Sequence, residues 1–312
     1  SSNCFPRVRY TSGEMEKYIC VKDLEDAATA VLPKTARDYY KSGATEEQTL
    51  SENKLAFQRL RLRPKCLVGV TGCDLRTNIL GNEVSMPVGL SPTAMQRMAH
   101  PDGELASARA AQAEGAIFTL STISTSSIEE VAEAAPDATK WFQLYIYKDR
   151  LANFAGHLST KIQSTGEGSG LNNYVQNLFD KNLTWDESFN TFHCFSITKL
   201  PIIAKGVLRG DDALKAVEAG CSAVLVSNHG ARQLDGVPAT IEALPEIIDA
   251  VKNHNVDVYL DGGVTTGTDA GVQKMLSIFR TELEYTFQIA GTPTISDITK
   301  DMVRHESAYS KL

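Results

Sequence analysis

The sequence predicts an α/β protein whose parallel strands close into a (β/α)8 TIM barrel. Two observations support this prediction. Short apolar runs of the buried-strand type alternate with helical stretches along the chain, which is typical of parallel sheets covered by helices. Polar residues end many of these runs, as at Ser121, Lys205 and Asp261. Because a barrel gathers all its strand ends at one mouth, whereas a doubly wound sheet has one crevice, the pattern favours the barrel.

The elements are expected in the following order. Apolar spacing of the i, i+3, i+4 type predicts helices over residues 16–62, with Gly43 as a stop. Six strands are then expected, at residues 86–94, 117–121, 141–147, 201–206, 223–228 and 256–263. The helices that follow them are expected at residues 102–116, 126–136, 211–220, 239–253 and 271–291. A serine cap or an acidic first turn, and a glycine stop, delimit several of these helices.

Six strands are two fewer than a closed barrel of this kind requires. Fifty residues without a buried strand precede residue 201, and no helix-plus-strand unit separates residues 261–269 from the last helix. We interpret this as two βα units missing from the chain, near 150/151 and 269/270. Either the sequence joins segments that are not contiguous in the native protein, or the gene product is genuinely shortened.

Composition and charge exclude some functions. The 312 residues carry a formal net charge of −7, so nucleic acid is not an expected partner. No run of 18 apolar residues occurs, so no membrane span is expected. The histidines and cysteines show no zinc-type spacing. Residues 1–14 are interpreted as a leader or extension and residues 15–312 as a single domain, which ends in Ser310, Lys311 and Leu312, a tripeptide of the peroxisomal address type.

The residues at the strand ends suggest chemistry. His229 follows one strand and Arg232 lies three residues later; an imidazole can accept a proton, and a guanidinium fits a carboxylate. A capping histidine and a surface arginine are an equally acceptable interpretation of the spacing. Lys205 ends an apolar strand, where its charge requires a partner. In Asp261-Gly262-Gly263, the glycines allow either a close backbone approach to an anion or only a tight turn.

Several longer motifs occur together in one order. The sequence resembles the FMN-dependent 2-hydroxy acid oxidases, the glycolate oxidase family, from about residue 18 onwards. The matching segments are DYYKSGA (38–44), PTAMQRMAHPDGE (92–104), WFQLYIYKDR (141–150), PIIAKGVLRGDDA (201–213), SNHGARQLDGVPATI (227–241) and LDGGV (260–264).

The resemblance implies a role for each matching position. His229 would be the active-site base, Arg232 and Tyr39 would hold the substrate carboxylate, and Tyr145 would hydrogen-bond the substrate hydroxyl or keto oxygen. Lys205 would lie near the FMN ring and stabilise negative charge on it. The remaining positions implied to contact FMN are Pro92, Thr93, Ala94, Ser121, Gln143, Ser227, Asp261, Gly262, Gly263, Val264 and Thr265.

The sequence also departs from the family. The strand that would carry an aspartate paired with the base, the arginine after it, and a Gly-Arg pair for the phosphate are not found. Thr265 and Thr266 stand where arginine is usual. Ile123 stands where glycolate-preferring members often have tryptophan, which predicts a wider pocket and tolerance of longer 2-hydroxy acids.

The resemblance implies oxidation of an (S)-2-hydroxy acid to a 2-oxo acid, with FMN as cofactor and O2 reduced to hydrogen peroxide. It further implies a homotetramer, and the terminal tripeptide implies binding to the peroxisomal import receptor. Two alternatives stay open. One is a flavin dehydrogenase that passes electrons to a protein acceptor, and the other is a truncated, non-catalytic relative.

Overall fold

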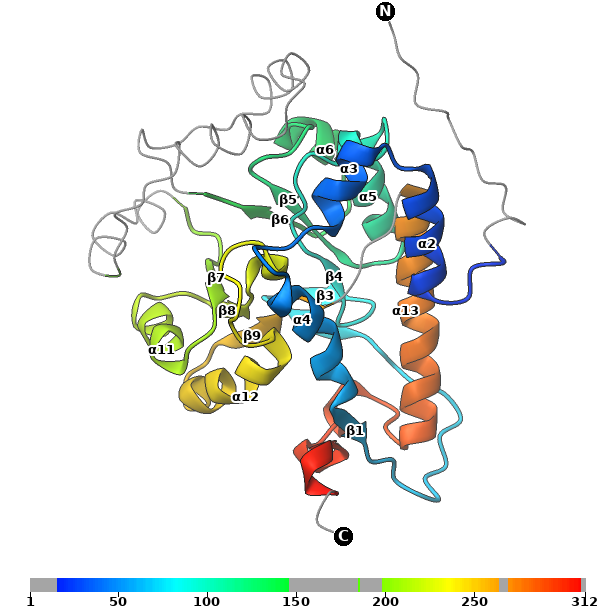
Figure 1. Cartoon of the computed structure of the whole chain (residues 1–312). Coiled ribbons are helices and arrows are strands. Elements are labelled where there is room, and N and C mark those ends of the chain that lie inside the picture. The colour runs from blue at the N-terminus through cyan, green and yellow to red at the C-terminus, as the bar shows by residue number, and fades with distance from the viewer. Residues whose placement is uncertain (1–15, 146–184, 186–197, 264–268, 310–312) are drawn as a thin grey trace, which may run out of the picture.

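The centre of the molecule consists of two parallel three-stranded sheets (Figure 1). The computed structural model describes residues 16–145, 185, 198–263 and 269–309. One sheet has the order β4 (Gly89–Leu90), β5 (Ile117–Ser121), β6 (Lys140–Gln143), and the other β7 (Ile203–Val207), β8 (Ala223–Val226), β9 (Asp257–Leu260). Neighbouring strands are parallel and follow each other in sequence, as successive βα units of a barrel do.

The six predicted strands are confirmed, and β5 has the predicted bounds. The largest difference is at β4, which shrinks from the predicted residues 86–94 to two residues. Pro87 and Pro92 flank it, and proline cannot donate a hydrogen bond to a strand ladder.

The two sheets are not joined to each other by strand pairing within the described residues: β6 does not pair with β7, nor β9 with β4. These openings fall where the sequence analysis expects two βα units to be missing. The expected junction at 150/151 lies outside the described residues, and Asp269 and Ala270 begin α13 (Asp269–Ala290) directly after the undescribed residues 264–268. The predicted six strands are thus arranged as two groups of three.

Helices cover the outer faces of both sheets. Helix α5 (Gly103–Ala113) lies beside β5 and α6 (Ile128–Ala134) packs on α5, while α11 (Gly210–Glu218) and α12 (Thr240–Val251) lie beside β8 (Figure 1). The face of α5 that packs inward is rich in buried alanines, which let the helix approach closely. Helix α6 begins with the reciprocal Ser127–Glu130 capping box, so the predicted serine cap is confirmed.

The N-terminal helical region divides into three helices, α2 (Val21–Val31), α3 (Lys34–Lys41) and α4 (Gln48–Gln58). Pro33 separates the first two, and the loop with Gly43 separates α3 from α4. Helix α2 lies against the long helix α13, which also packs on α5 (Figure 1). The predicted helix at residues 271–291 is therefore confirmed.

Two antiparallel pairs were not predicted. Strand β1 (Leu60–Leu62) pairs with β10 (Val303–His305), and β2 (Thr77–Ile79) pairs with β3 (Asn82–Val84). The two-residue turn Leu80–Gly81 has positive φ at both positions, 48° and 82°, which matches the twist of a hairpin.

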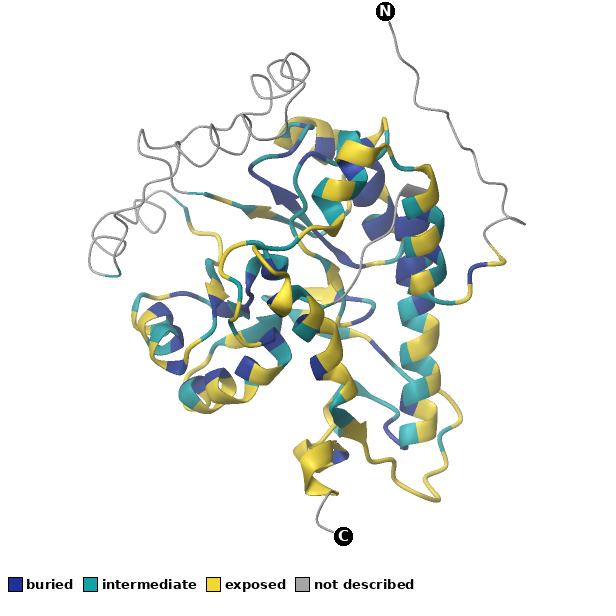
Figure 2. Ribbon diagram, in the orientation of Figure 1, coloured by how far each residue is buried: buried dark blue, intermediate teal, exposed yellow. Residues whose placement is uncertain are grey.

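The buried apolar residues form three clusters, and Figure 2 shows the buried residues on the helices and strands that contribute to them. Two of them, with centres such as Met86, Leu276 and Phe118, draw on residues 18–138 and 272–295. The third, around Val224 and Ile247, draws only on residues 185–258. Each group of three strands thus has its own hydrophobic core.

Helices long and apolar enough to cross a bilayer are absent from the described part of the chain. Over the same residues, no group of three or more His, Cys, Asp or Glu side chains could hold a metal ion.

Candidate functional site

The polar residues that follow the strands meet across the gap between the two sheets. Ser91 Oγ, after β4, donates to Asp261 Oδ2, after β9, at 3.1 Å. On the opposite side, Tyr145 Oη, after β6, lies 3.3 Å from His229 Nε2, after β8. The carboxyl ends of both sheets therefore face one mouth, as the barrel prediction requires.

A lysine–aspartate pair lies at the centre of this mouth. Lys205 Nζ, on β7, is 2.9 Å from Asp261 Oδ2 and donates to Ser227 Oγ at 2.7 Å. The two charged side chains are only 21% and 15% exposed. Since a charge so far from water requires compensation, Asp261 is the partner that the sequence position of Lys205 predicted.

His229 is held with an unusual backbone. It begins the short 3-10 turn η2 (His229–Ala231) with φ of 58°, and its N–H donates to Ser227 Oγ at 3.1 Å. Burial, and next the positive charge of Lys205, lower the pKa of His229 from 6.5 to about 4, while Asp261 acts in the opposite direction. The imidazole is therefore neutral at physiological pH and can accept a proton.

This low pKa predicts a pH-dependent stability. In the unfolded chain His229 takes up a proton near pH 6.5, but in the folded chain only near pH 4. The free energy of unfolding should therefore fall as the pH drops from about 6.5 to 4, by about 3 kcal/mol from this group. The variant His229→Gln should lack this contribution. Urea unfolding of both proteins at pH 7, 5 and 4 measures it; equal pH dependence would contradict it.

Arg232 and Tyr39 come together, as the resemblance implied. Arg232 Nη2 donates to the carbonyl oxygens of Tyr39 at 2.5 Å and Tyr40 at 2.9 Å, and the guanidinium carbon lies 5.1 Å from the centre of the Tyr39 ring. Burial raises the pKa of Tyr39, which keeps its phenol protonated. The backbone of α3 thus fixes the guanidinium beside the phenol.

The loops after β4, β5 and β6 are tied to each other. Gln143 Oε1 accepts from Ser121 Oγ at 3.3 Å, and Met95 N–H donates to the carbonyl of Ile123 at 3.0 Å. Pro92, Thr93 and Ala94 lie in the same β4 loop. These predicted cofactor positions therefore line one part of the mouth.

Two residues of this region were missed by sequence reasoning. Thr122 is buried and its Oγ accepts from Tyr145 N–H at 3.2 Å. Glu104, fully buried on α5, accepts from Gln96 N–H at 3.0 Å, Thr125 N–H at 2.8 Å and two hydroxyls. Thr122 could have been found by its place at a strand end. Glu104 is the last residue of the matching segment 92–104, and that motif is the one sequence signal that separates it from an ordinary acidic first-turn residue.

Gly262 and Gly263 have φ of 93° and 86°. A Cβ on Gly263 would lie 2.2 Å from the carbonyl oxygen of Asn53, and one on Gly262 would lie 3.1 Å from Thr240 Oγ1. Both glycines are thus required by their conformation and by close packing. Their implied contact with FMN stays a prediction, and Val264 and Thr265 lie outside the described residues.

The residues at the mouth fit FMN. Asp261 Oδ1 is buried and has no hydrogen-bond partner among the described residues, so it is available to accept a hydroxyl such as those of a ribityl chain. The Lys205 ammonium beside it suits the electron-rich side of a flavin ring. These two groups, with Ser91, Gln143 and Ser227, would hold the cofactor.

The fold and the site define the class of α/β-barrel enzymes with a cofactor at the strand ends. A family model described as FMN-dependent dehydrogenase matches residues 28–155 and 152–270. The chain belongs to the FMN-dependent dehydrogenase family, and its cofactor is FMN.

Curated relatives agree with this family. The human 2-hydroxyacid oxidase 1 is 40% identical over an alignment 373 residues long, which covers 96% of this chain and 100% of the relative. Glycolate oxidase of Spinacia oleracea is 38% identical over 91% of this chain and 95% of the relative. Since an alignment of 373 residues exceeds the 312 of this chain, the human protein has residues without a counterpart here.

Solved structures also agree. The flavin-binding domain of baker's yeast flavocytochrome b2 superimposes with a TM-score of 0.81 at 30% identity, over 96% of this chain and 89% of that chain. A mandelate oxidase with (S)-mandelic acid gives a TM-score of 0.76 at 29% identity, over 90% of this chain and 96% of that chain. These neighbours are (β/α)8 barrels, so the predicted fold class is confirmed.

Proposed function

We propose that this protein oxidises (S)-2-hydroxy acids to 2-oxo acids and passes the electrons to O2, which forms hydrogen peroxide. The observation that carries the proposal is the contact of Tyr145 Oη with His229 Nε2 beside the Lys205–Asp261 pair. It combines a neutral base, a phenol and a half-buried cation at one mouth. The names of the relatives, 2-hydroxyacid oxidase and glycolate oxidase, support the same reaction.

Each side chain has a proposed task. His229 Nε2 removes a proton from the substrate, and the Tyr145 hydroxyl binds the substrate oxygen at the reacting carbon. Arg232 binds the carboxylate through Nε and Nη1, because Nη2 is engaged by the carbonyls of residues 39 and 40. FMN supplies the acceptor for two electrons when it is bound. Lys205 balances negative charge at the site.

A direct assay tests the reaction. Purified protein with FMN-type visible absorbance is mixed under air with glycolate, lactate and longer 2-hydroxy acids, and hydrogen peroxide is measured. Peroxide in proportion to the 2-oxo acid is expected. Turnover only with an added acceptor such as ferricyanide would support the dehydrogenase alternative, which the likeness to flavocytochrome b2 favours. No turnover with either acceptor would support the non-catalytic alternative.

The chain length of the substrate is proposed to depend on Ile123. This residue follows β5, and its backbone is fixed by Ser121 Oγ and by Met95 N–H. Glycolate-preferring members of the family often have a tryptophan at this position, and the smaller isoleucine side chain leaves more room for the substrate. The variant Ile123→Trp should lower kcat/KM for a six-carbon 2-hydroxy acid at least ~10-fold, with less than about 3-fold change for glycolate. Equal effects on both substrates in steady-state assays would contradict this.

We further propose import into peroxisomes through Ser310, Lys311 and Leu312, with residues 15–312 as one domain that assembles into a homotetramer. An Arabidopsis thaliana relative, 37% identical, is named a peroxisomal (S)-2-hydroxyacid oxidase. A fluorescent protein fused in front of residues 300–312 should enter peroxisomes, and the same fusion without the last three residues should not. Light scattering measures the assembly, and a monomeric mass would contradict the tetramer.

A further inference from the structure

The segment that presents His229 has an uncommon backbone. Three successive residues, His229, Gly230 and Ala231, have φ of 58°, 62° and 62°. Residues with a Cβ rarely adopt this left-handed region unless their surroundings impose it. Some other group must therefore hold η2 in place.

The side chain of Asn228 is that group. Ala231 N–H donates to both the backbone carbonyl and the side-chain Oδ1 of Asn228, each at 3.1 Å, so the amide side chain reinforces the turn over His229. The carbonyl of Ala231 in turn accepts from Ala44 N–H at 2.8 Å. The orientation of the Asn228 amide therefore decides whether its Oδ1 supports the Ala231 N–H in addition to the backbone carbonyl.

Asn53, on α4, fixes that orientation. Its Nδ2 donates to Asn228 Oδ1 at 3.0 Å, and its Oδ1 accepts from Asn228 Nδ2 at 2.7 Å. The two residues are 2% and 4% exposed, so water cannot replace either bond. If the Asn228 amide turned over, it would set its NH2 against Ala231 N–H and against the NH2 of Asn53.

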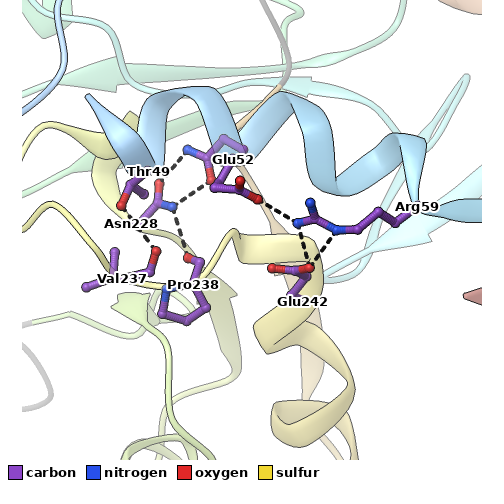
Figure 3. Close-up of polar contacts among 8 residues, drawn as sticks. Thr49, Glu52, Arg59, Asn228, Val237, Pro238 and Glu242 are labelled. Atoms are coloured by element: carbon purple, nitrogen blue, oxygen red, sulfur yellow. Dashed lines mark hydrogen bonds and ion pairs between the residues drawn. The ribbon is translucent and has the colours of Figure 1, made fainter. Parts of the chain in front are cut away.

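Helix α4 is a firm support for this pair (Figure 3). The buried Thr49 donates to the carbonyl of Val237 at 3.1 Å. Arg59 binds both Glu52 of its own helix and Glu242 of α12, each at 2.7 Å. In Figure 3, Asn228 lies below α4 with its amide pointing to the helix. Several contacts thus hold α4 in place, and the contact made by Asn53 is the one with Asn228, next to His229.

We propose that Asn53 is a positioning residue for the proposed reaction: through the reciprocal amide pair with Asn228 it holds the base His229 in its left-handed conformation at the mouth. The inference rests on the proposed function for its kinetic part and on the hydrogen bonds alone for its structural part. Arg232 is held separately by α3. Loss of Asn53 should therefore affect proton transfer more than substrate binding.

The variants Asn53→Ala and Asn53→Asp test this. Alanine removes both bonds, whereas aspartate keeps the volume and the acceptor but sets an oxygen against Asn228 Oδ1. Both should lower kcat by roughly 30- to 100-fold, since a shift of about 1 Å has effects of this size, while KM changes less than about 3-fold. Unchanged kcat in an FMN-loaded variant would overturn the proposal.

A second measurement does not depend on turnover. Lys205, Asp261, Arg232 and Tyr145 face His229 in the native loop, and all remain in the variants. If the loop relaxes towards solvent, the His229 pKa should rise from about 4 towards 6.5. NMR titration of 15N-histidine-labelled protein, with the His229 signal assigned by its loss in His229→Gln, measures this. An unchanged pKa would also overturn the proposal.

Thr49→Val is the matched control. It removes a buried hydrogen bond between the same helix and the same stretch of chain but leaves the Asn53–Asn228 pair intact. It should lower Tm while kcat and the His229 pKa stay unchanged. If Thr49→Val and Asn53→Ala changed kcat and the His229 pKa equally, Asn53 would have only a structural role. If the wild-type protein turns over no 2-hydroxy acid, the proposed function fails, and the titration still decides the positioning role.

Discussion

Replacing His229 by glutamine is expected to lower kcat for 2-hydroxy acids about 10³-fold while FMN stays bound. General base catalysis contributes ~10²- to 10⁴-fold in other enzymes, and glutamine keeps a similar length without a proton-accepting nitrogen. The neighbouring Lys205 and Asp261 keep their ion pair in this variant, so the cofactor site should be preserved. Peroxide formation and the visible absorbance of the same sample measure the two properties.

The control for this variant is His254→Gln. His254 lies exposed in the turn after α12, and its replacement should leave kcat within about 2-fold. A His229→Gln protein that is folded, contains FMN and retains a tenth or more of the wild-type rate would exclude His229 as the base.

Replacing Lys205 by methionine should have the second large effect. Asp261 would lose its cation while remaining 85% removed from water, as its side chain is 15% exposed. Breaking a buried pair in this way costs about 3–5 kcal/mol. The variant should therefore unfold at a clearly lower temperature and retain little FMN. Thermal unfolding and the ratio of visible to ultraviolet absorbance measure both.

A double variant separates stability from chemistry. In Lys205→Met combined with Asp261→Asn, no charge is left uncompensated, so most of the stability should return. The rate should not return, because the positive charge at the mouth is still absent. Lys215→Met, which changes an exposed lysine on α11, is the control. A single Lys205→Met variant with wild-type stability and rate would contradict the assigned role.

Much of the fold could be predicted because buried strands appear in the sequence as short apolar runs. The run 223–226 is apolar on both faces and 117–121 is mostly apolar, and the structure buries most of both runs. The antiparallel pairs β1–β10 and β2–β3 leave no such trace. These strands have three residues each, mix polar with apolar side chains and are mostly exposed. The partner of Leu60 is His305, far along the chain.

The residues of the candidate site also differ in how far the sequence predicts them. His229, Lys205 and Asp261 could be predicted because each ends a recognisable strand. Asn53 could not, since it lies on a helix and its partner Asn228 is 175 positions away. Hydrogen bonds between distant polar side chains depend on the tertiary fold, which no local periodicity encodes.

The interpretation of two missing βα units explains the openings beside β6 and β9. The family model matches in two stretches that meet at residues 152–155 and end at 270, close to the two expected junctions. Within the described residues, both features agree with six βα units.

The division of the apolar residues into separate clusters has a consequence for how cofactor and protein depend on each other. One lobe, residues 203–261, has its own apolar core. It is joined to the rest of the molecule by α3 and α4 and, at the mouth, by the polar contacts Ser91–Asp261 and Tyr145–His229. A molecule seated there adheres to both lobes at once. Its binding free energy is then added to the stability of the folded protein. The melting temperature should therefore rise as the cofactor site fills and fall as it empties.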